Sequence, residues 1–322
     1  FSSRRVPGAK RNRPTSRRLT RVSWSNHLHP EATRIKLELE RRVRAGDPPT
    51  RRLSSDWRER VEDAIWAGNN AGLELLQREA GYTRVGHHGG AAGRYADAHA
   101  FTVASFFQHD SRDRDPQLHI HNAILNRVEG PDGTWRTVDG RSLHRWRPAA
   151  AAVAERTTEE RITASLGMLT ATRPDGKARE VLGVSEQAMG LVSTRRHKVT
   201  VKTAELVEAF EARYGHAPNG YQLERLAQQA TLATRAAKSH DGETREQLLD
   251  RVEQKMRREV DGGLAGIADA ALAARPDQIT VQQWSPSEVI EVALAEAQQS
   301  KSAWTRPDLI RALNTALPDH LG

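Results

Sequence analysis

The sequence predicts an α+β fold, in which a small antiparallel sheet is packed with helices and followed by a mainly helical C-terminal region. Three observations lead to this prediction. Residues 101–109 and 119–125 are interpreted as two strands, along which side chains alternate between the two faces. The polar loop between them contains Pro116 and is long enough to return the chain for antiparallel pairing. Helical periodicity dominates both before and after these two strands.

The two strands carry three histidines. Side chains alternate between the faces of a strand, so Phe107 and His109 point the same way on the first strand, and His119 and His121 share a face on the second. If the two faces coincide, three imidazoles converge. Imidazole is a common neutral ligand of divalent first-row metals, and three of them leave coordination positions open for substrate oxygens. The sheet is therefore expected to carry a three-histidine metal site.

The remaining elements are predicted from local signals along the chain. A helix over residues 31–44 ends at Gly46, and a clearer one runs from Asp56 to Ala80, with Asp56 and Glu59 as its capping box. Downstream, the same kinds of signal predict strands over 82–88 and 134–138, a helix from Pro148 to Leu166, a hairpin over 168–172 and 178–182, and helices over 185–215 and 221–260.

The composition excludes some classes of function, and the distribution of charge weakens the argument that the net charge indicates nucleic-acid binding. The chain of 322 residues has no cysteine, which excludes disulfides and thiolate chemistry and favours a cytoplasmic location. No apolar run approaches 18 residues, so no membrane span is expected. The net charge of +8 comes from eight basic residues within the first 24, and the other 41 basic residues equal the 41 acidic ones. An argument for nucleic-acid binding must therefore rest on a site.

The residues around the histidines occur in an order that is typical of one family. The first strand ends in Phe107-Gln108-His109-Asp110, Ser111-Arg112 opens the loop, and Asp115-Pro116-Gln117-Leu118-His119-Ile120-His121 begins the next strand. This order resembles the histidine triad of conjugative relaxases of the HUH endonuclease superfamily, in particular the relaxase domain of the relaxase-helicase type. The resemblance continues over residues 122–127, 132–136 and 139–143 and reaches about residue 196.

The resemblance implies a mechanism and its partners. His109, His119 and His121 would bind one divalent cation, Mg²⁺ or Mn²⁺, which polarises the scissile phosphate of single-stranded DNA at a transfer origin. A tyrosine would attack that phosphate and form a tyrosyl–DNA intermediate, which makes the reaction a site- and strand-specific nick. Other proteins of the conjugation machinery are a further class of partner that the resemblance admits.

The resemblance does not identify the nucleophile in this chain. The family's tyrosine and an orienting aspartate lie near the N-terminus, where residues 3–52 do not match the pattern, so the chain is expected to be an N-terminally incomplete relaxase. None of Tyr82, Tyr95, Tyr214 and Tyr221 occupies the nucleophile position. Of the two near the sheet, Tyr82 is expected to be a packing residue, and Tyr95, expected in a loop, is the preferred candidate for a substitute nucleophile. Asp110 and Asp115 flank the histidines and are expected to be solvated. As given, the chain is therefore expected to bind metal and, weakly, single-stranded DNA, but not to complete the relaxase strand transfer.

Arginines near the sheet are the expected DNA contacts, because guanidinium matches phosphate geometry. They are Arg84, Arg94 and Arg112. Four regions are expected: a basic N-terminal segment over 1–55, the remainder of the relaxase domain over 56–196, a helical extension over 197–260, and a linker with the start of a further domain over 261–322.

Two other classes of function stay open on the sequence alone. One is an unrelated three-histidine metallohydrolase that uses metal-bound water, which would cut DNA without a covalent intermediate. The other is an inert single-stranded DNA-binding remnant that needs no metal. Trapping of a covalent DNA adduct separates the relaxase from both, and metal titration separates the other two from each other.

Overall fold

The computed structural model describes residues 20–22, 48–86, 93–173, 178–237, 243–277, 279 and 283–321. Within these residues, nine short strands and nine helices form a mixed α and β structure. The strands are β1 (Thr20–Val22), β2 (Tyr82–Val85), β3 (Arg94–Asp97), β4 (Val103–Asp110), β5 (Pro116–Ile124), β6 (Val128–Glu129), β7 (Trp135–Arg136), β8 (Thr170–Thr172) and β9 (Arg179–Val181). The helices are α2 (Pro48–Ala80), α3 (Gly140–Leu166), α4 (Glu186–Leu191), α5 (Thr194–Tyr214), α6 (Gly220–Ala233), α7 (Arg245–Glu259), α8 (Gly263–Ala273), α9 (Pro286–Ser300) and α10 (Arg306–Ala316).

The main sheet has three antiparallel strands in the order β1-β5-β4. β4 and β5 pair over most of their length, which confirms the two strands and the returning loop expected from the sequence. Val103 pairs with Ile124, Phe106 with His121, and Gln108 with His119. Directly opposed residues of an antiparallel pair share a face. His119 and His121 therefore lie on the same face as Phe106 and Gln108.

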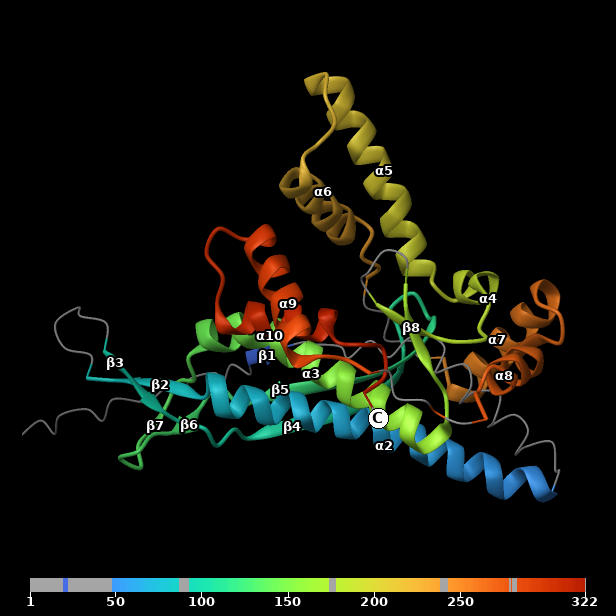
Figure 1. The fold of residues 1–322 in the computed structure, drawn as a ribbon, viewed down its shortest axis with the longest axis horizontal. Coiled ribbons are helices and arrows are strands. Elements are labelled where there is room, and N and C mark those ends of the chain that lie inside the picture. Colours follow the sequence, from blue (N-terminus) through green and yellow to red (C-terminus); the bar gives the residue numbers. More distant parts are fainter. Residues whose placement is uncertain are drawn as a thin grey trace, which may run out of the picture.

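The other face of this sheet is covered by two long helices. α2 and α3 run side by side across β4 and β5 in Figure 1. Ile120 and Ile124 are buried against them, at 1% and 0% exposure. Phe107 packs against the same core, whereas Phe106 is 56% exposed on the histidine face. The alternation along β5 thus buries the apolar residues under the helices and leaves the histidines on the opposite side.

Two helix starts differ from the sequence prediction. α2 begins at Pro48 and not at Asp56. α3 begins at Gly140, and Pro148, the expected start, lies inside it. The reason for the second difference is the cap, because the Asp139 side chain accepts hydrogen bonds from the backbone N–H groups of Arg141 and Ser142. The helix expected over residues 31–44 lies outside the described residues.

The C-terminal half forms three smaller units. The region expected as one helix over 221–260 is two helices, α6 and α7, and α5 and α6 form a hairpin that projects from the body in Figure 1. α4, α7 and α8 share a small core built around Val252 and Met256. α9 and α10 pack on α3, where the buried Arg156 side chain donates to the carbonyls of Asn314 and Pro318. In the described part of the chain, no helix combines the length and hydropathy that crossing a membrane requires.

Candidate functional site

Two of the three histidines come together at the start of β5. The Nε2 atoms of His119 and His121 are 3.1 Å apart. His119 is buried at 6% exposure, and its Nδ1 lies 3.0 Å from the Gln117 carbonyl oxygen. A carbonyl only accepts, so in the neutral ring Nδ1 carries the proton and Nε2 keeps its lone pair. This tautomer, held by a backbone carbonyl, is the one that metal-ligating histidines commonly adopt.

This pair fits a divalent cation as two ligands of a larger set. Metal–nitrogen bonds of about 2.1 Å allow two ligands of one cation to lie up to about 4.2 Å apart, and the observed 3.1 Å separation is within that reach. The side chains of Phe106 and Gln108, on the same sheet face, are exposed. The histidine face is therefore open to solvent beside the pair.

His109 does not complete a cluster in this structure. The regular β4–β5 register ends at Gln108, and a bulge lies between Gln108 and Asp110. The His109 ring lies beside that of Phe107, with centroids 5.3 Å apart, and Phe107 faces the helices. Among the residues that the structure describes, no three His, Asp or Glu side chains form a group able to hold a metal ion. The three-histidine site expected on the sheet is thus not shown, and His109 stays a predicted ligand.

Of the two aspartates that flank the histidines, one is exposed to solvent as expected and the other is buried. Asp110 is exposed, as expected of a loop residue. Asp115 is buried at 8% exposure, and both of its carboxylate oxygens accept hydrogen bonds from Thr194 at the start of α5. The expectation that Asp115 is solvated was therefore wrong. A helix that arrives from 79 residues later covers this carboxylate, and no local pattern in the loop indicates that helix.

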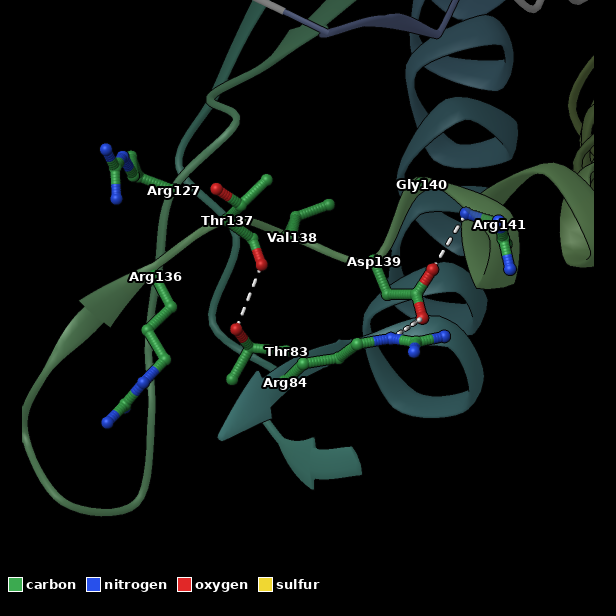
Figure 2. Close-up of a pocket in the computed structure, with 9 residues that line it drawn as sticks. All are labelled: Thr83, Arg84, Arg127, Arg136, Thr137, Val138, Asp139, Gly140 and Arg141. Atoms are coloured by element: carbon green, nitrogen blue, oxygen red, sulfur yellow. Dashed lines mark hydrogen bonds and ion pairs between the residues drawn. The ribbon is translucent and has the colours of Figure 1, made fainter. Parts of the chain in front are cut away.

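An arginine-lined pocket lies where β2, β7 and the start of α3 meet (Figure 2). Its volume is about 750 Å³. The lining includes four arginines from separate segments and one carboxylate: Arg84, Arg127, Arg136, Arg141 and Asp139. Arg136 forms a double hydrogen bond with Asp132, and the Nε atom of Arg84 lies 3.6 Å from Asp139. The four arginines of the lining are thus accompanied by two carboxylates, those of Asp139 and Asp132, so the pocket has an excess of positive charge.

Asp139 is held in its charged form although it is buried. Burial opposes its ionisation, but the N–H group of Arg141, the hydroxyl of Tyr95, the N–H group of Ser142 and the charge of Arg84 together outweigh burial. The pKa of Asp139 therefore lies below the ordinary value of 3.8. An ionised Asp139 caps α3 and fixes Arg84 at the wall of the pocket.

Of the three arginines predicted to contact DNA, one lines this pocket. Arg84 does so, Arg94 is exposed at the start of β3, and Arg112 lies in the β4–β5 loop, where it donates to the Ala236 carbonyl oxygen at 3.5 Å. Sequence reasoning missed Arg127, Arg136 and Arg141, which only the fold brings together with Arg84. The structure therefore does not gather the three predicted arginines at one place.

The four tyrosines lie on elements away from the start of β5. Tyr82 and Tyr95 belong to the β2–β3 hairpin, where their rings contact each other at 6.1 Å. Tyr95 was expected in a loop, but it lies in strand β3. Tyr214 is the last residue of α5 and Tyr221 is the second residue of α6, so both belong to the α5–α6 hairpin. The histidine pair instead lies in β5, the strand that follows the β4–β5 loop and its Asp115–Thr194 hydrogen bond.

A family model described as TrwC relaxase matches residues 51–259, which is more than half of the chain. The chain belongs to the TrwC relaxase family. The matched region includes β4, β5 and the histidine pair, and it extends through α7.

Solved TrwC structures have the same fold. A metal-bound complex of the conjugative relaxase TrwC with oriT DNA is 22% identical, with a TM-score of 0.52, over 77% of this chain and 70% of that one. A metal-free complex is also 22% identical, with a TM-score of 0.52, over 76% and 71%. A further oriT complex is 23% identical, with a TM-score of 0.53, over 73% and 68%. The comparison with curated proteins gave no match.

Proposed function

We propose that this chain is a conjugative relaxase that nicks single-stranded DNA at a transfer origin, in a site- and strand-specific reaction that depends on a divalent metal. The observation that carries the proposal is the pair of histidine Nε2 atoms 3.1 Å apart on a sheet of a TrwC-family chain. The names of the solved relatives support the substrate class, since they describe TrwC bound to oriT DNA. The place of action that fits a DNA substrate and a chain without cysteine is the cytoplasm.

In this proposal, His119 and His121 hold the cation together with His109. His109 lies at the bulge, where the backbone alternation is interrupted, so a modest change there brings its ring to the other side of β4. The bound metal would polarise the phosphate and stabilise the charge that gathers on its oxygens. Mg²⁺ and Mn²⁺ are the proposed ions, and the metal-bound TrwC relative supports a metal at such a site.

The DNA backbone is proposed to follow the positive pocket. Arg84 is fixed there by Asp139, and Arg127 and Arg141 are exposed on its rim. Arginine side chains that track phosphates position a nucleic acid without reading its sequence. Single-stranded DNA is therefore the proposed partner, and other conjugation proteins are proposed as further partners of a complex assembled on it.

The metal part of the proposal is tested by calorimetry with Mn²⁺. The double variant His119→Ala/His121→Ala is expected to bind Mn²⁺ at least about tenfold more weakly than the wild type, because two imidazole ligands are lost. His144→Ala, which changes an exposed histidine on α3, is the matched control and is expected to bind like the wild type. Equal affinity in the wild type and the double variant would refute the histidine metal site.

One structural observation favours a second candidate, a single-stranded DNA binder that needs no metal. The His109 ring lies beside that of Phe107, and among the described residues no group of three metal-ligating side chains is found. Fluorescence anisotropy with a labelled single-stranded oligonucleotide separates the candidates when it is measured with Mn²⁺ and with a chelator. A nick that requires Mn²⁺ and leaves a covalent protein–DNA adduct, both seen by denaturing electrophoresis of the same samples, supports the relaxase. Binding that is equal in both conditions, with no nick from any oligonucleotide of the transfer region, supports the inert binder.

A further inference from the structure

The β4–β5 loop is a closed turn that joins the histidine strand to the C-terminal helices. The backbone N–H of Ser111 donates to the Asp115 carbonyl at 2.9 Å, and that of Arg114 donates to the Ser111 carbonyl at 3.0 Å. The Ser111 hydroxyl accepts from the Asp115 N–H at 3.2 Å. Arg114 has a φ of 61°, a left-handed conformation that costs a non-glycine residue free energy. The loop is thus defined by its own hydrogen bonds at a cost in backbone strain.

Asp115, at the end of this turn, caps a helix from a distant part of the chain. Its Oδ2 atom accepts from the backbone N–H of Thr194, and its Oδ1 atom accepts from the Thr194 hydroxyl, both at 2.8 Å. Thr194 is the first residue of α5, and Ser193, the residue in the N-cap position, makes no side-chain capping bond. A carboxylate at a helix N-terminus accepts a hydrogen bond from a free N–H group, and its negative charge interacts favourably with the positive end of the helix dipole. Asp115 therefore supplies in tertiary contact the cap that α5 lacks locally.

Two further contacts tie the same loop to helices. The Asp113 side chain is 1% exposed and pairs with Lys198, with Arg195 at 4.0 Å, so it meets the first turns of α5. Arg251 of α7 donates to the Arg114 carbonyl at 2.6 Å. The loop is thus connected to α5 through two acids and to α7 through one arginine.

These contacts matter because the α5–α6 hairpin has little other attachment. α5 has no fully buried residue, and α6 buries only Ala230. The hairpin stands away from the body in Figure 1 and meets it at its base. Without a buried face, the direction of a helix is determined by what holds its end. At this end the first half of α5 is basic, with Arg195, Arg196, Lys198 and Lys202.

We propose that Asp115 is a positioning residue, which holds the base of the α5–α6 hairpin in one pose next to the start of the strand that carries the histidine pair. Asp115 is separated from His119 by only three residues of β5, of which Leu118 is buried at 1% exposure. The strand therefore transmits the position of the histidines to the helix that Asp115 caps. This pose brings the basic half of α5 to the DNA strand that approaches the histidines. The last step rests on the proposed function, whereas the capping role does not.

Hydrogen exchange tests the capping role directly. In Asp115→Ala, the amides of residues 194–201 are expected to exchange about fivefold faster than in the wild type, which corresponds to the loss of a helix cap. Exchange in β5 is expected to remain unchanged. Asp115→Asn keeps an oxygen acceptor for the Thr194 N–H and is expected to recover most of the protection. Unchanged exchange at residues 194–201 in Asp115→Ala would overturn the proposal.

A milder variant and two binding measurements complete the test. Thr194→Ala removes the hydroxyl bond and keeps the backbone bond, so it is expected to fall between Asp115→Ala and the wild type even if Asp115→Ala folds poorly. Mn²⁺ affinity by calorimetry is expected to be unchanged in Asp115→Ala, while the half-saturating concentration of a labelled single-stranded oligonucleotide rises about fivefold and recovers in Asp115→Asn.

The outcomes separate this proposal from the proposed function. A loss of Mn²⁺ affinity as large as that of His119→Ala/His121→Ala would make Asp115 part of the metal site and overturn the positioning role. Faster exchange at residues 194–201, with DNA affinity unchanged where the wild type binds DNA, would overturn the link from the cap to the DNA. If the wild type itself bound no oligonucleotide, the proposed function would fail, and the exchange data would still decide whether Asp115 holds the hairpin.

Discussion

Arg84 donates a hydrogen bond to the hydroxyl of Tyr95 at 2.6 Å, and its guanidinium also lies over the Tyr95 ring, 4.5 Å from the centroid. The two residues face each other across the β2–β3 hairpin, where they are paired in register. Asp139 joins them, because the Nε atom of Arg84 lies 3.6 Å from its Oδ2 atom. The Tyr95 hydroxyl thus accepts a hydrogen bond from an arginine of the pocket, and Tyr95 lies in β3, not in the strand that carries the histidine pair.

Tyr95→Phe is therefore expected to leave any nicking activity intact. The change removes one hydrogen bond to a charged group and keeps the ring under Arg84, so it should lower stability by about 1 kcal/mol. The measurement is incubation with labelled single-stranded DNA of the transfer region and Mn²⁺, followed by denaturing electrophoresis. A covalent protein–DNA band that is present in the wild type and vanishes in Tyr95→Phe would identify Tyr95 as the nucleophile and contradict the prediction.

Arginines on the rim of the pocket are expected to determine how DNA affinity depends on salt. Arg127→Gln and Arg141→Gln should each weaken binding of single-stranded DNA and reduce the slope of log K against log salt by about 0.7, one released counterion each. Arg145→Gln, on an exposed position of α3 outside the pocket, is the matched control. Anisotropy titrations between low and high salt measure the slopes. Identical slopes for Arg141→Gln and Arg145→Gln would remove the pocket from the DNA path.

The contact between α2 and α3 depends on a glycine. A Cβ atom added at Gly68 would lie 2.0 Å from the Thr158 hydroxyl oxygen and 2.4 Å from the Ala154 carbonyl oxygen. Gly68→Ala is expected to force the two helices apart and to lower the free energy of unfolding by about 3 kcal/mol, measured by urea denaturation. Gly190→Ala, in helix α4 where a Cβ meets no atom within 4 Å, should instead gain up to about 1 kcal/mol. Equal effects of the two changes would contradict the close approach.

A carboxyl on α3 gives the protein a specific pH dependence. The Glu155 residue is exposed as a whole, but it lines a groove between α3 and α10. Desolvation there, and then the neighbouring Glu159, raise the pKa of Glu155 from 4.5 to about 7, against the opposing charge of Arg179. The unfolded chain therefore releases this proton more readily than the folded one, so this group makes stability fall as pH rises from about 4.5 to about 7. Glu155→Gln is expected to raise Tm relative to the wild type at pH 8 and to leave it unchanged at pH 4.

The control for this pH effect is Glu224→Gln, which changes an exposed carboxyl on α6. Its Tm should follow the wild type at both pH values, because the side chain stays in solvent. Thermal unfolding followed by circular dichroism provides the comparison. A gain for Glu155→Gln that is equal at pH 4 and pH 8 would indicate a packing effect and not the titration of the carboxyl.

The sequence alone determined the local parts of the site. A spacing of two put His119 and His121 on one face of a strand, since that alternation is a property of the extended backbone. The polar loop and the alternation on both sides predicted the antiparallel pair of β4 and β5, which the structure confirms. The residues around the histidines also indicated the family by themselves, because that motif is a short continuous stretch, and the family match confirms it.

Tertiary structure decided what depends on partners far along the chain. The register of β4 against β5 pairs Phe107 with Ile120, so the Phe107 side chain, with the His109 ring beside it, faces away from His119 and His121. A shift of one residue would reverse these faces, and no local pattern determines the register. Asp115 is buried because Thr194 reaches it from 79 residues away, and the arginine pocket joins segments from Arg84 to Arg141. The periodicity of a sequence indicates which face of a helix or strand is apolar. Which distant residues pack against that face depends on the packing of the whole chain, and no local sequence pattern determines it.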